Sequence, residues 1–253
     1  MKGWPVRERQ RLWLTQWSGD PHMCSRTVRL EVLQRVPLFM DLTTAEIMSL
    51  ESHVQAHGYR GGELIYRQGE NASSLFVMAS GAAKLIRPSA HGQDVVLNIL
   101  GPGEGCGTLG ISGPPQYPDS AMALTDSCAL EIPAAVFQEA IELHPRLGLT
   151  VLDEVLHRLE QAQETIRRLS ADNVRQRVAA ALLVLADKLG DPRAETIILE
   201  LPLTHTDLAA LTGTTPETVS RVMSRLRDDS IVDTGRCWTT ILDRTRLSAA
   251  AEG

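Results

Sequence analysis

The side chains best suited to direct recognition chemistry lie in residues 203–227, which read LTHTDLAALTGTTPETVSRVMSRLR. Glu217, Ser220, Arg221 and Arg225 fall outside the apolar positions in the second half of this segment. Arginine can donate two hydrogen bonds to O6 and N7 of guanine, and glutamate can accept one from N4 of cytosine. The set therefore indicates a segment that reads base edges in the major groove of DNA.

The spacing within this segment predicts two short helices joined by a tight turn. Thr204 can cap the first helix, Gly213 permits the left-handed conformation of the turn, and Thr214 or Thr215 can cap the second helix ahead of Pro216. This is a helix-turn-helix by spacing. The expected buried stripe of the second helix is Val219, Val222, Met223 and Leu226. The expected DNA contacts are Thr204, Thr215, Glu217, Thr218, Ser220, Arg221 and Arg225. The alternative is a helical hairpin with a solvated charged face.

Residues 231–242 predict a short β-hairpin after the two helices. Ile231-Val232 and residues 238–242 are apolar, and Thr234-Gly235-Arg236 between them is a turn signal. Such a two-stranded wing is a common companion of a helix-turn-helix.

Composition limits the remaining possibilities. The chain has 253 residues, 43% of them hydrophobic, so it can build a sizeable core, and its formal net charge of -6 gives no general attraction to nucleic acid. The four cysteines are scattered without a C-x-x-C pair, so we expect neither a disulfide framework nor a metal site. No apolar stretch is long enough to span a membrane, and the charged start does not resemble a secretory signal, so a cytoplasmic protein is expected. No nucleophile–base pair or P-loop indicates an enzyme.

The N-terminal half predicts helices followed by a β-barrel or sandwich. Residues 28–54 have helical periodicity that Pro37 divides into two short helices, with Thr43 or Thr44 as an N-cap. Residues 59–132 alternate short apolar stretches with glycine-rich turns, which is typical of short strands. The strands are expected at residues 63–66, 75–78, 83–86, 95–99 and 129–132.

Residues 148–170 form the most regular helical pattern in the chain. Its apolar residues fall at two positions of a seven-residue repeat over about three heptads, which is typical of a coiled-coil seam. The expected dimer contacts are Leu152, Val155, Leu159, Ala162, Ile166 and Leu169. The alternative is a helix packed on its own barrel, and both can hold on different faces.

These elements predict an α+β chain in four parts. Residues 1–22 are a flexible tail or a mis-annotated start, 23–148 a sensing β-roll, 149–170 a dimerisation helix, and 171–253 a winged helix-turn-helix. In the last part, Asn173 can cap a helix over 174–189 that Gly190 ends, and residues 197–201 are expected to form a strand.

This order of parts resembles the CRP/FNR family of regulators over residues 28–247. Matching stretches include Arg67-Gln68-Gly69-Glu70, Gly81-Ala82-Ala83-Lys84-Leu85, Gly101-Pro102-Gly103-Glu104 and, most specifically, Glu217-Thr218-Val219-Ser220-Arg221. The resemblance implies an N-terminal jelly-roll effector domain, similar to cyclic-nucleotide-binding domains, and a homodimer whose DNA-binding domains rotate under ligand control. The triplet Glu217, Ser220 and Arg221 resembles that of the FNR branch, which implies a TTGAT-like half-site in an inverted repeat.

The resemblance does not carry cAMP binding over. In the cAMP branch a Gly-Glu-Leu turn and a following Arg-Ser pair hold the ribose and phosphate, and here the matching residues are Gly107-Thr108-Leu109 and Asp119-Ser120. Asp119 would repel an anion, and no arginine lies between Arg87 and Arg146 to restore the missing cation from that loop.

Two other signals known in this family are iron–sulfur clusters and haem. A four-cysteine cluster would lack ligands, since only Cys24 lies near the start and Cys128 near the barrel position, and buried packing is expected for Cys106 and Cys128. Haem is possible, with His53, His57, His91 or His157 as candidate axial ligands and His157 the foremost of them. The effector, a small molecule or a gas, is thus left open.

The expected partners are double-stranded DNA, a second copy of the chain and RNA polymerase, with no membrane. The alternative from another class is a small-molecule-binding signalling subunit similar to kinase regulatory domains. The recognition helix argues against this alternative, because such subunits lack one.

Overall fold

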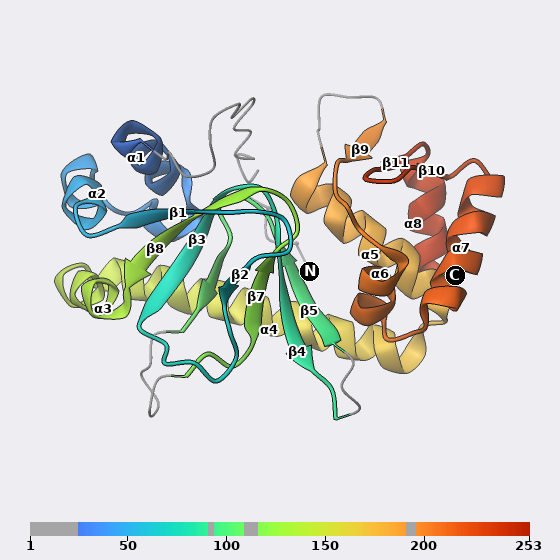
Figure 1. Ribbon diagram of the computed structural model, residues 1–253, viewed down its shortest axis with the longest axis horizontal. Coiled ribbons are helices and arrows are strands. Elements are labelled where there is room, and N and C mark those ends of the chain that lie inside the picture. The colour runs from blue at the N-terminus through green and yellow to red at the C-terminus, as the bar shows by residue number, and fades with distance from the viewer. Residues whose placement is uncertain (1–24, 91–93, 109–115, 191–195) are drawn as a thin grey trace, which may run out of the picture.

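The computed structural model describes residues 25–90, 94–108, 116–190 and 196–253. A β-roll with three surrounding helices forms the N-terminal part, and a bundle of helices with a small sheet forms the C-terminal part (Figure 1). One long helix runs along the β-roll toward the C-terminal part and connects the two. No helix within the described ranges is both long and apolar enough to cross a membrane. The expected tail over residues 1–22 lies outside the described residues.

The chain begins with the predicted pair of short helices. These are α1 (Arg26–Arg35), the 3-10 turn η1 (Pro37–Phe39) and α2 (Thr44–Glu51). Pro37 does separate the helices, and Thr43 caps α2 through a capping box in which the Glu46 carboxylate accepts from the Thr43 N–H.

Eight strands within the described ranges form two antiparallel sheets that face each other. One sheet has the order β1-β8-β3-β6 and the other β2-β7-β4-β5. The strands are β1 Gln55–Tyr59, β2 Leu64–Tyr66, β3 Ser74–Ser80, β4 Ala83–Pro88, β5 Asp94–Leu100, β6 Gly105–Gly107, β7 Ser120–Ala123 and β8 Ser127–Pro133. The expected β-roll is therefore present, with β5 as an outer strand of its sheet.

Two apolar clusters on opposite faces of the first sheet hold the β-roll together. Phe76 and Met78 of β3 point between the sheets, whereas Val77 and Ala79 on the same strand face the helices α1 to α3. Successive side chains of a strand alternate between faces, so a strand covered on both sides is apolar throughout. This explains why the sequence of β3 shows no polar alternation.

The helices α3 (Ala134–Leu143) and α4 (Pro145–Ala171) follow the β-roll. The start of α4 is anchored by Leu147, which is buried in the cluster between the first sheet and the helices. The remainder of α4 extends past the β-roll to the C-terminal part (Figure 1).

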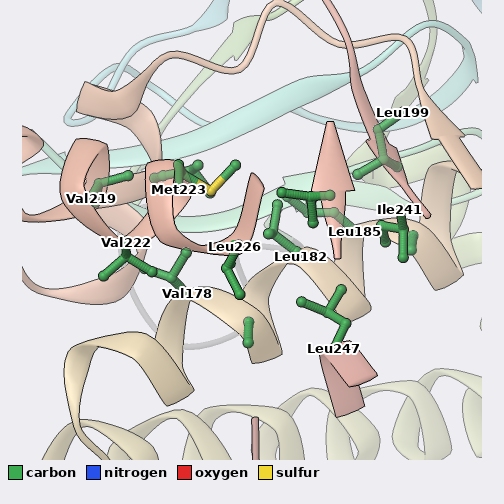
Figure 2. Packing of buried hydrophobic residues seen from close by; sticks show 14 of the residues in the cluster. Val178, Leu182, Leu185, Leu199, Val219, Val222, Met223, Leu226, Ile241 and Leu247 are labelled. Carbon is green, nitrogen blue, oxygen red and sulfur yellow. The ribbon is translucent and has the colours of Figure 1, made fainter. Parts of the chain in front are cut away.

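The C-terminal part is a winged helix-turn-helix. Its elements are α5 Val174–Leu189, β9 Ile197–Leu199, α6 His205–Thr212, α7 Pro216–Asp228, β10 Val232–Thr234, β11 Thr239–Ile241 and α8 Arg244–Glu252. Apolar side chains from α5, α7, β9, β11 and α8 converge in its core (Figure 2). As predicted, Asn173 caps α5, and Val219, Val222, Met223 and Leu226 are buried.

The structure adds elements that the sequence patterns did not predict. These are β1, β6, β7, α3 and α8. The wing also differs from the expected two strands, because β9 pairs with β11 and makes a sheet of order β10-β11-β9. The predicted strand at 197–201 thus belongs to the wing and is shorter, ending at Leu199.

Candidate DNA interface and effector pocket

The turn between α6 and α7 has the predicted geometry. Thr204 caps α6 in a capping box with Asp207, and Gly213 ends α6 with φ +63° and ψ +49°. A side chain in this left-handed conformation costs about 1–2 kcal/mol, which glycine avoids. Thr215 then caps α7, with Pro216 at its first position. These local signals fix the angle at which α7 leaves the turn.

The outer face of α7 carries the residues predicted to contact DNA. Glu217, Arg221 and Arg225 are exposed, and Ser220 lies half-buried between them and the core. Thr218 is half-buried, and its hydroxyl lies 3.1 Å from that of Thr215. The opposite face of α7 is the buried stripe, so the helix is held on one side and presents polar groups on the other.

Arg221 and Glu217 occupy neighbouring turns of α7. The Arg221 guanidinium donates to the Glu217 carbonyl oxygen at 3.4 Å and to the Thr218 hydroxyl at 3.3 Å. Hydrogen bonds from the Glu217 backbone N–H and the Thr215 hydroxyl, with the charge of Arg221, hold the pKa of Glu217 below its usual value. Glu217 therefore stays ionised and can accept a hydrogen bond. Because both hydrogen bonds of Arg221 are long, its guanidinium can leave them and bind a DNA base instead.

Arg177 on α5 holds the helix-turn-helix turn in place, and the sequence patterns did not single it out. Its guanidinium donates to the carbonyl oxygens of Thr212 at 2.8 Å, Asp172 at 2.7 Å and Gly213 at 3.4 Å. It thereby ties the helix-turn-helix turn to the junction between α4 and α5. Leu169 of α4 also reaches this turn, because a Cβ atom at Gly213 would lie 2.8 Å from its Cδ2 atom.

The predicted dimer seam lies along the solvent face of α4. None of its six residues packs into the apolar clusters of the chain itself: Leu152, Val155, Leu159, Ala162, Ile166 and Leu169 are all exposed or nearly so. The exposed fractions of Leu152, Leu159 and Ile166 are 54%, 52% and 63%. Leu149 and Leu156 are exposed as well and widen the apolar face. The single chain thus leaves a long apolar stripe uncovered.

The interior of the β-roll near β6 and β7 is filled by aromatic rings around one carboxylate. The Tyr66 hydroxyl donates to the Asp119 carboxylate at 2.8 Å, and the Tyr66 and Tyr117 rings stack with centroids 4.1 Å apart. Burial raises the pKa of Asp119, which the hydrogen bond from Tyr66 and the charges of Arg87 and Arg158 only partly offset. Burial likewise raises the pKa of the adjacent Cys106 thiol to about 12.

Most of the other predicted pocket residues lie near this cluster. Ser120 is buried and accepts from the Gln68 N–H at 2.8 Å, and Gly107 has φ +98° beside Tyr117. Thr108 follows it at the end of β6. Leu109 lies outside the described residues. His157 is half-buried on α4, and its ring nitrogen Nε2 lies 2.9 Å from the side-chain nitrogen of Gln161.

Two arginines from outside the loop approach Asp119. Arg87 on β4 donates to the Pro118 carbonyl oxygen at 3.0 Å, and Arg158 on α4 donates to the Gly105 carbonyl oxygen at 2.9 Å. The sequence excludes only a cation from the loop itself, whereas the fold brings these two in from β4 and α4. Arg158, rather than its neighbour His157, is the α4 residue that reaches the strand β6.

The candidate haem and cluster ligands are spread over the fold. His53 is exposed at the end of α2, and the His57 ring lies 2.8 Å from the Glu131 carboxylate on the inner face of the first sheet. His91 and Cys24 lie outside the described residues. Cys106 and Cys128 are buried, as predicted. Among the described residues, no group of three or more histidine, cysteine or acidic side chains is placed to hold a metal ion.

Comparison with known families and proteins matches both parts of the chain. The model of the cyclic nucleotide-binding domain matches residues 57–144, and that of the Crp-like helix-turn-helix domain matches residues 176–250. The cyclic AMP receptor protein of Thermus thermophilus is 31% identical over 217 residues, covering 86% of this chain and 97% of the relative. The CRP-like cAMP-activated global transcriptional regulator of Mycobacterium tuberculosis is 26% identical, covering 77% and 87% respectively.

A solved structure shares the fold. The structure of FixK2 from Bradyrhizobium japonicum matches with a TM-score of 0.70 at 22% identity, covering 78% of this chain and 96% of that one. The similarity therefore extends over both the β-roll and the helix-turn-helix.

Proposed function

Because this chain belongs to the CRP/FNR family of DNA-binding transcription regulators, we propose that it binds a TTGAT-like inverted repeat as an effector-gated homodimer. The observation that carries the base preference is the exposed face of α7, where Glu217 and Arg221 stand one turn apart with Ser220 between them. These are the residues that resemble the FNR-branch triplet. The proposal is a binding function without a catalytic step, and it places the protein in the cytoplasm with the DNA.

The assignment of roles follows the geometry of a helix-turn-helix. The second, recognition helix of such a motif lies in the major groove of DNA, and the first helix crosses the sugar–phosphate backbone of the DNA. Arg221 is assigned to a guanine and Glu217 to a cytosine. Thr204, Thr215, Thr218 and Arg225 are assigned to positioning contacts, because helix N-termini and hydroxyl groups commonly bind phosphates.

The uncovered stripe of α4 supports the homodimer. Two copies related by a two-fold axis would bury Leu152, Leu159 and Ile166 against each other, and the same axis matches a symmetric operator. In the proposed division of the chain, residues 23–148 sense the effector, residues 149–170 form the dimerisation helix and residues 171–253 bind DNA. Residues 1–22 remain a tail or a mis-annotated start. RNA polymerase is the further partner that we propose for a regulator at a promoter.

We propose an effector other than cAMP, although the names of two relatives specify cAMP. Asp119 stands where the cAMP branch has an arginine, and the Tyr66 and Tyr117 rings occupy the space beside it. Arg87 and Arg158 lie close enough to influence Asp119, but each already donates to a backbone carbonyl. A cyclic phosphate would have to displace these contacts.

Selection of binding sites from random DNA tests the proposed function. The full-length protein should recover inverted repeats with TTGAT-like halves. Arg221→Ala should weaken binding to the selected site by about 1–3 kcal/mol and relax the preference at its guanine, because one bidentate base contact is lost.

The matched control is Arg244→Ala, which removes an exposed arginine on α8 that pairs with Asp187 at 2.8 Å, away from α7. This variant should keep the selected sequence. Recovery of unrelated or non-palindromic sequences would rule out the triplet assignment.

A further inference from the structure

The C-terminal part does not simply follow the β-roll along the chain but packs against it. Ile86 of β4 and Val96 and Ile99 of β5 belong to the same buried apolar cluster as the core of the helix-turn-helix. Gly101 lies so close to α5 that a Cβ atom there would meet the Leu189 Cδ2 atom at 2.6 Å. The interface is therefore a packed one, centred on the β4–β5 hairpin.

One lysine from the C-terminal part inserts into the β-roll side of this interface. The Lys188 ammonium group lies 3.0 Å from the Asn98 side-chain oxygen, 3.1 Å from the Ile99 carbonyl oxygen and 3.0 Å from the Glu104 carboxylate. Its side chain is only 12% exposed. An ammonium group has three N–H donors, so these three acceptors satisfy it completely.

A second lysine makes the reciprocal contact from the β-roll. Lys84 of β4 donates to the Asp207 carboxylate at 2.6 Å, and the two side chains are 19% and 9% exposed. The other Asp207 oxygen accepts from the Thr204 N–H and hydroxyl in the α6 capping box. Burial alone would raise the pKa of Asp207, but the hydrogen bonds from Lys84 and Thr204 lower it below its ordinary value. The β-roll thus binds the first turn of the helix-turn-helix.

The choice of residue at these two places is unusual for this chain. Only three of its 25 basic Lys and Arg residues are lysines: Lys2, Lys84 and Lys188. A lysine ammonium is a compact point charge, whereas a guanidinium is a planar fork. Both lysines in the described ranges lie at this interface, where a compact cation fits among close acceptors.

The same strands connect the interface to the aromatic cluster around Asp119. β4 pairs with β7, so that Ile86 lies opposite Ser120 and Lys84 opposite Met122. Across β5, Lys84 lies opposite Ile99, whose carbonyl oxygen Lys188 binds. A displacement of Asp119 and Ser120 would therefore reach Ile86 first, then Lys84 two residues along β4, and Lys188 through Ile99 of β5.

We propose that Lys84 and Lys188 form a two-point latch that holds the helix-turn-helix on the β4–β5 hairpin in the effector-free state and must open for DNA binding. The latch presupposes that the chain binds DNA as proposed above. In this proposal the latched arrangement is the effector-free one, in which Tyr66, Tyr117 and Asp119 fill the interior of the β-roll among themselves. In that state, contacts with the β-roll determine the position of the recognition helix α7, and contacts with operator DNA do not.

The scarcity of lysines allows a direct test by amine acetylation. The full-length protein is treated with the N-hydroxysuccinimide ester of acetate, alone and with saturating operator DNA, and acetylation of Lys84 and Lys188 is followed by mass spectrometry. In the free protein both should react at least about tenfold more slowly than in the unfolded chain. DNA should raise both rates by about fivefold or more. Equal protection with and without DNA would overturn the latch.

Variants give a second, independent readout. Lys84→Met and Lys188→Met keep the length of the side chain but remove its charge, and each should tighten effector-free DNA binding by about threefold to tenfold. Arg244→Met, which breaks an ion pair within the C-terminal part, should leave the affinity unchanged. Folded lysine variants that bind DNA no tighter than the wild type would also overturn the latch.

The outcomes separate the latch from the proposed function. If the wild type binds the operator while Lys84 and Lys188 stay protected, the latch alone is wrong. If neither the wild type nor any variant binds the operator, the proposed function itself is wrong.

Discussion

At the scale of single residues, the pairing of Asp119 with Tyr66 is the feature from which we infer what the proposed effector pocket can accept. A carboxylate in a half-buried position repels an anion, and its hydrogen bond to the Tyr66 hydroxyl already uses the group that a sugar hydroxyl would need. The Tyr117 ring, 4.1 Å from that of Tyr66, closes the space against a purine. A ligand must either be small or displace these rings.

We therefore expect no cAMP binding. Calorimetric titration of the wild type with nucleotide at about millimolar concentration should give no detectable heat. The same result is expected for Asp119→Asn, because the amide removes the charge but leaves the rings in place. The cyclic AMP receptor protein of Thermus thermophilus serves as the positive control. A dissociation constant in the micromolar range for the wild type would contradict the expectation.

The geometry of the helix-turn-helix could be predicted from sequence, because its signals are local. The N-caps Thr204 and Thr215, the glycine of the turn and the buried stripe of α7 each depend on neighbours within one helical turn. Arg87, Arg158 and Lys188 could not be predicted in this way, since their partners lie far away in the chain. The Lys188–Glu104 contact, for example, joins two elements that only the tertiary fold brings together.

At the scale of elements, α4 is anchored at its start and leaves most of its apolar heptad face uncovered. Leu147 anchors its start in the β-roll, and the residues of its heptad pattern face outward. A 27-residue helix with an exposed apolar stripe of this length is the form that a coiled-coil partner requires.

Leu159→Glu should therefore convert the protein to a monomer and abolish binding to the symmetric operator. Two-fold symmetry would place two carboxylates opposite each other in an apolar seam, where neither has a partner. Sedimentation velocity measures the change, and Gln161→Glu, which adds the same charge at an exposed position away from the seam, should leave the dimer intact. An unchanged dimer for Leu159→Glu would place the interface elsewhere.

The strands that the sequence patterns missed are those without strong local signals. β6 and β7 have three and four residues, and glycine occurs twice in β6 and once in β1. Such strands have too few apolar side chains to alternate, and pairing with β3, β4 and β8 defines them. The predicted helix over 174–189, by contrast, agrees with α5 at both ends because Asn173 and Gly190 cap it.

At the scale of the whole molecule, the β-roll and the helix-turn-helix share one apolar cluster. Ile86, Val96 and Ile99 contribute to the same buried core as Leu182, Leu208 and Leu226. The two parts matched by separate family models are thus joined by packing as well as by α4.

Heating should therefore unfold the chain in a single calorimetric transition, because the cluster loses its partners as soon as either part melts. The double variant Lys84→Met/Lys188→Met keeps the shared cluster, so its transition should remain single and move to a lower temperature. Arg244→Met should keep the single transition. Two separate transitions in the wild type would show that the shared cluster does not couple the parts.

The position of β5 has a consequence for dissecting the protein. β5 is the outer strand of its sheet, it is rich in valine, leucine and isoleucine, and α6 lies against it. A fragment that ends after α4 would expose β5, including the side chains of Val96 and Ile99. An exposed, apolar edge strand of this kind pairs with strands of other molecules and leads to aggregation. We therefore expect the β-roll to aggregate when it is separated from the helix-turn-helix, unless another element covers β5.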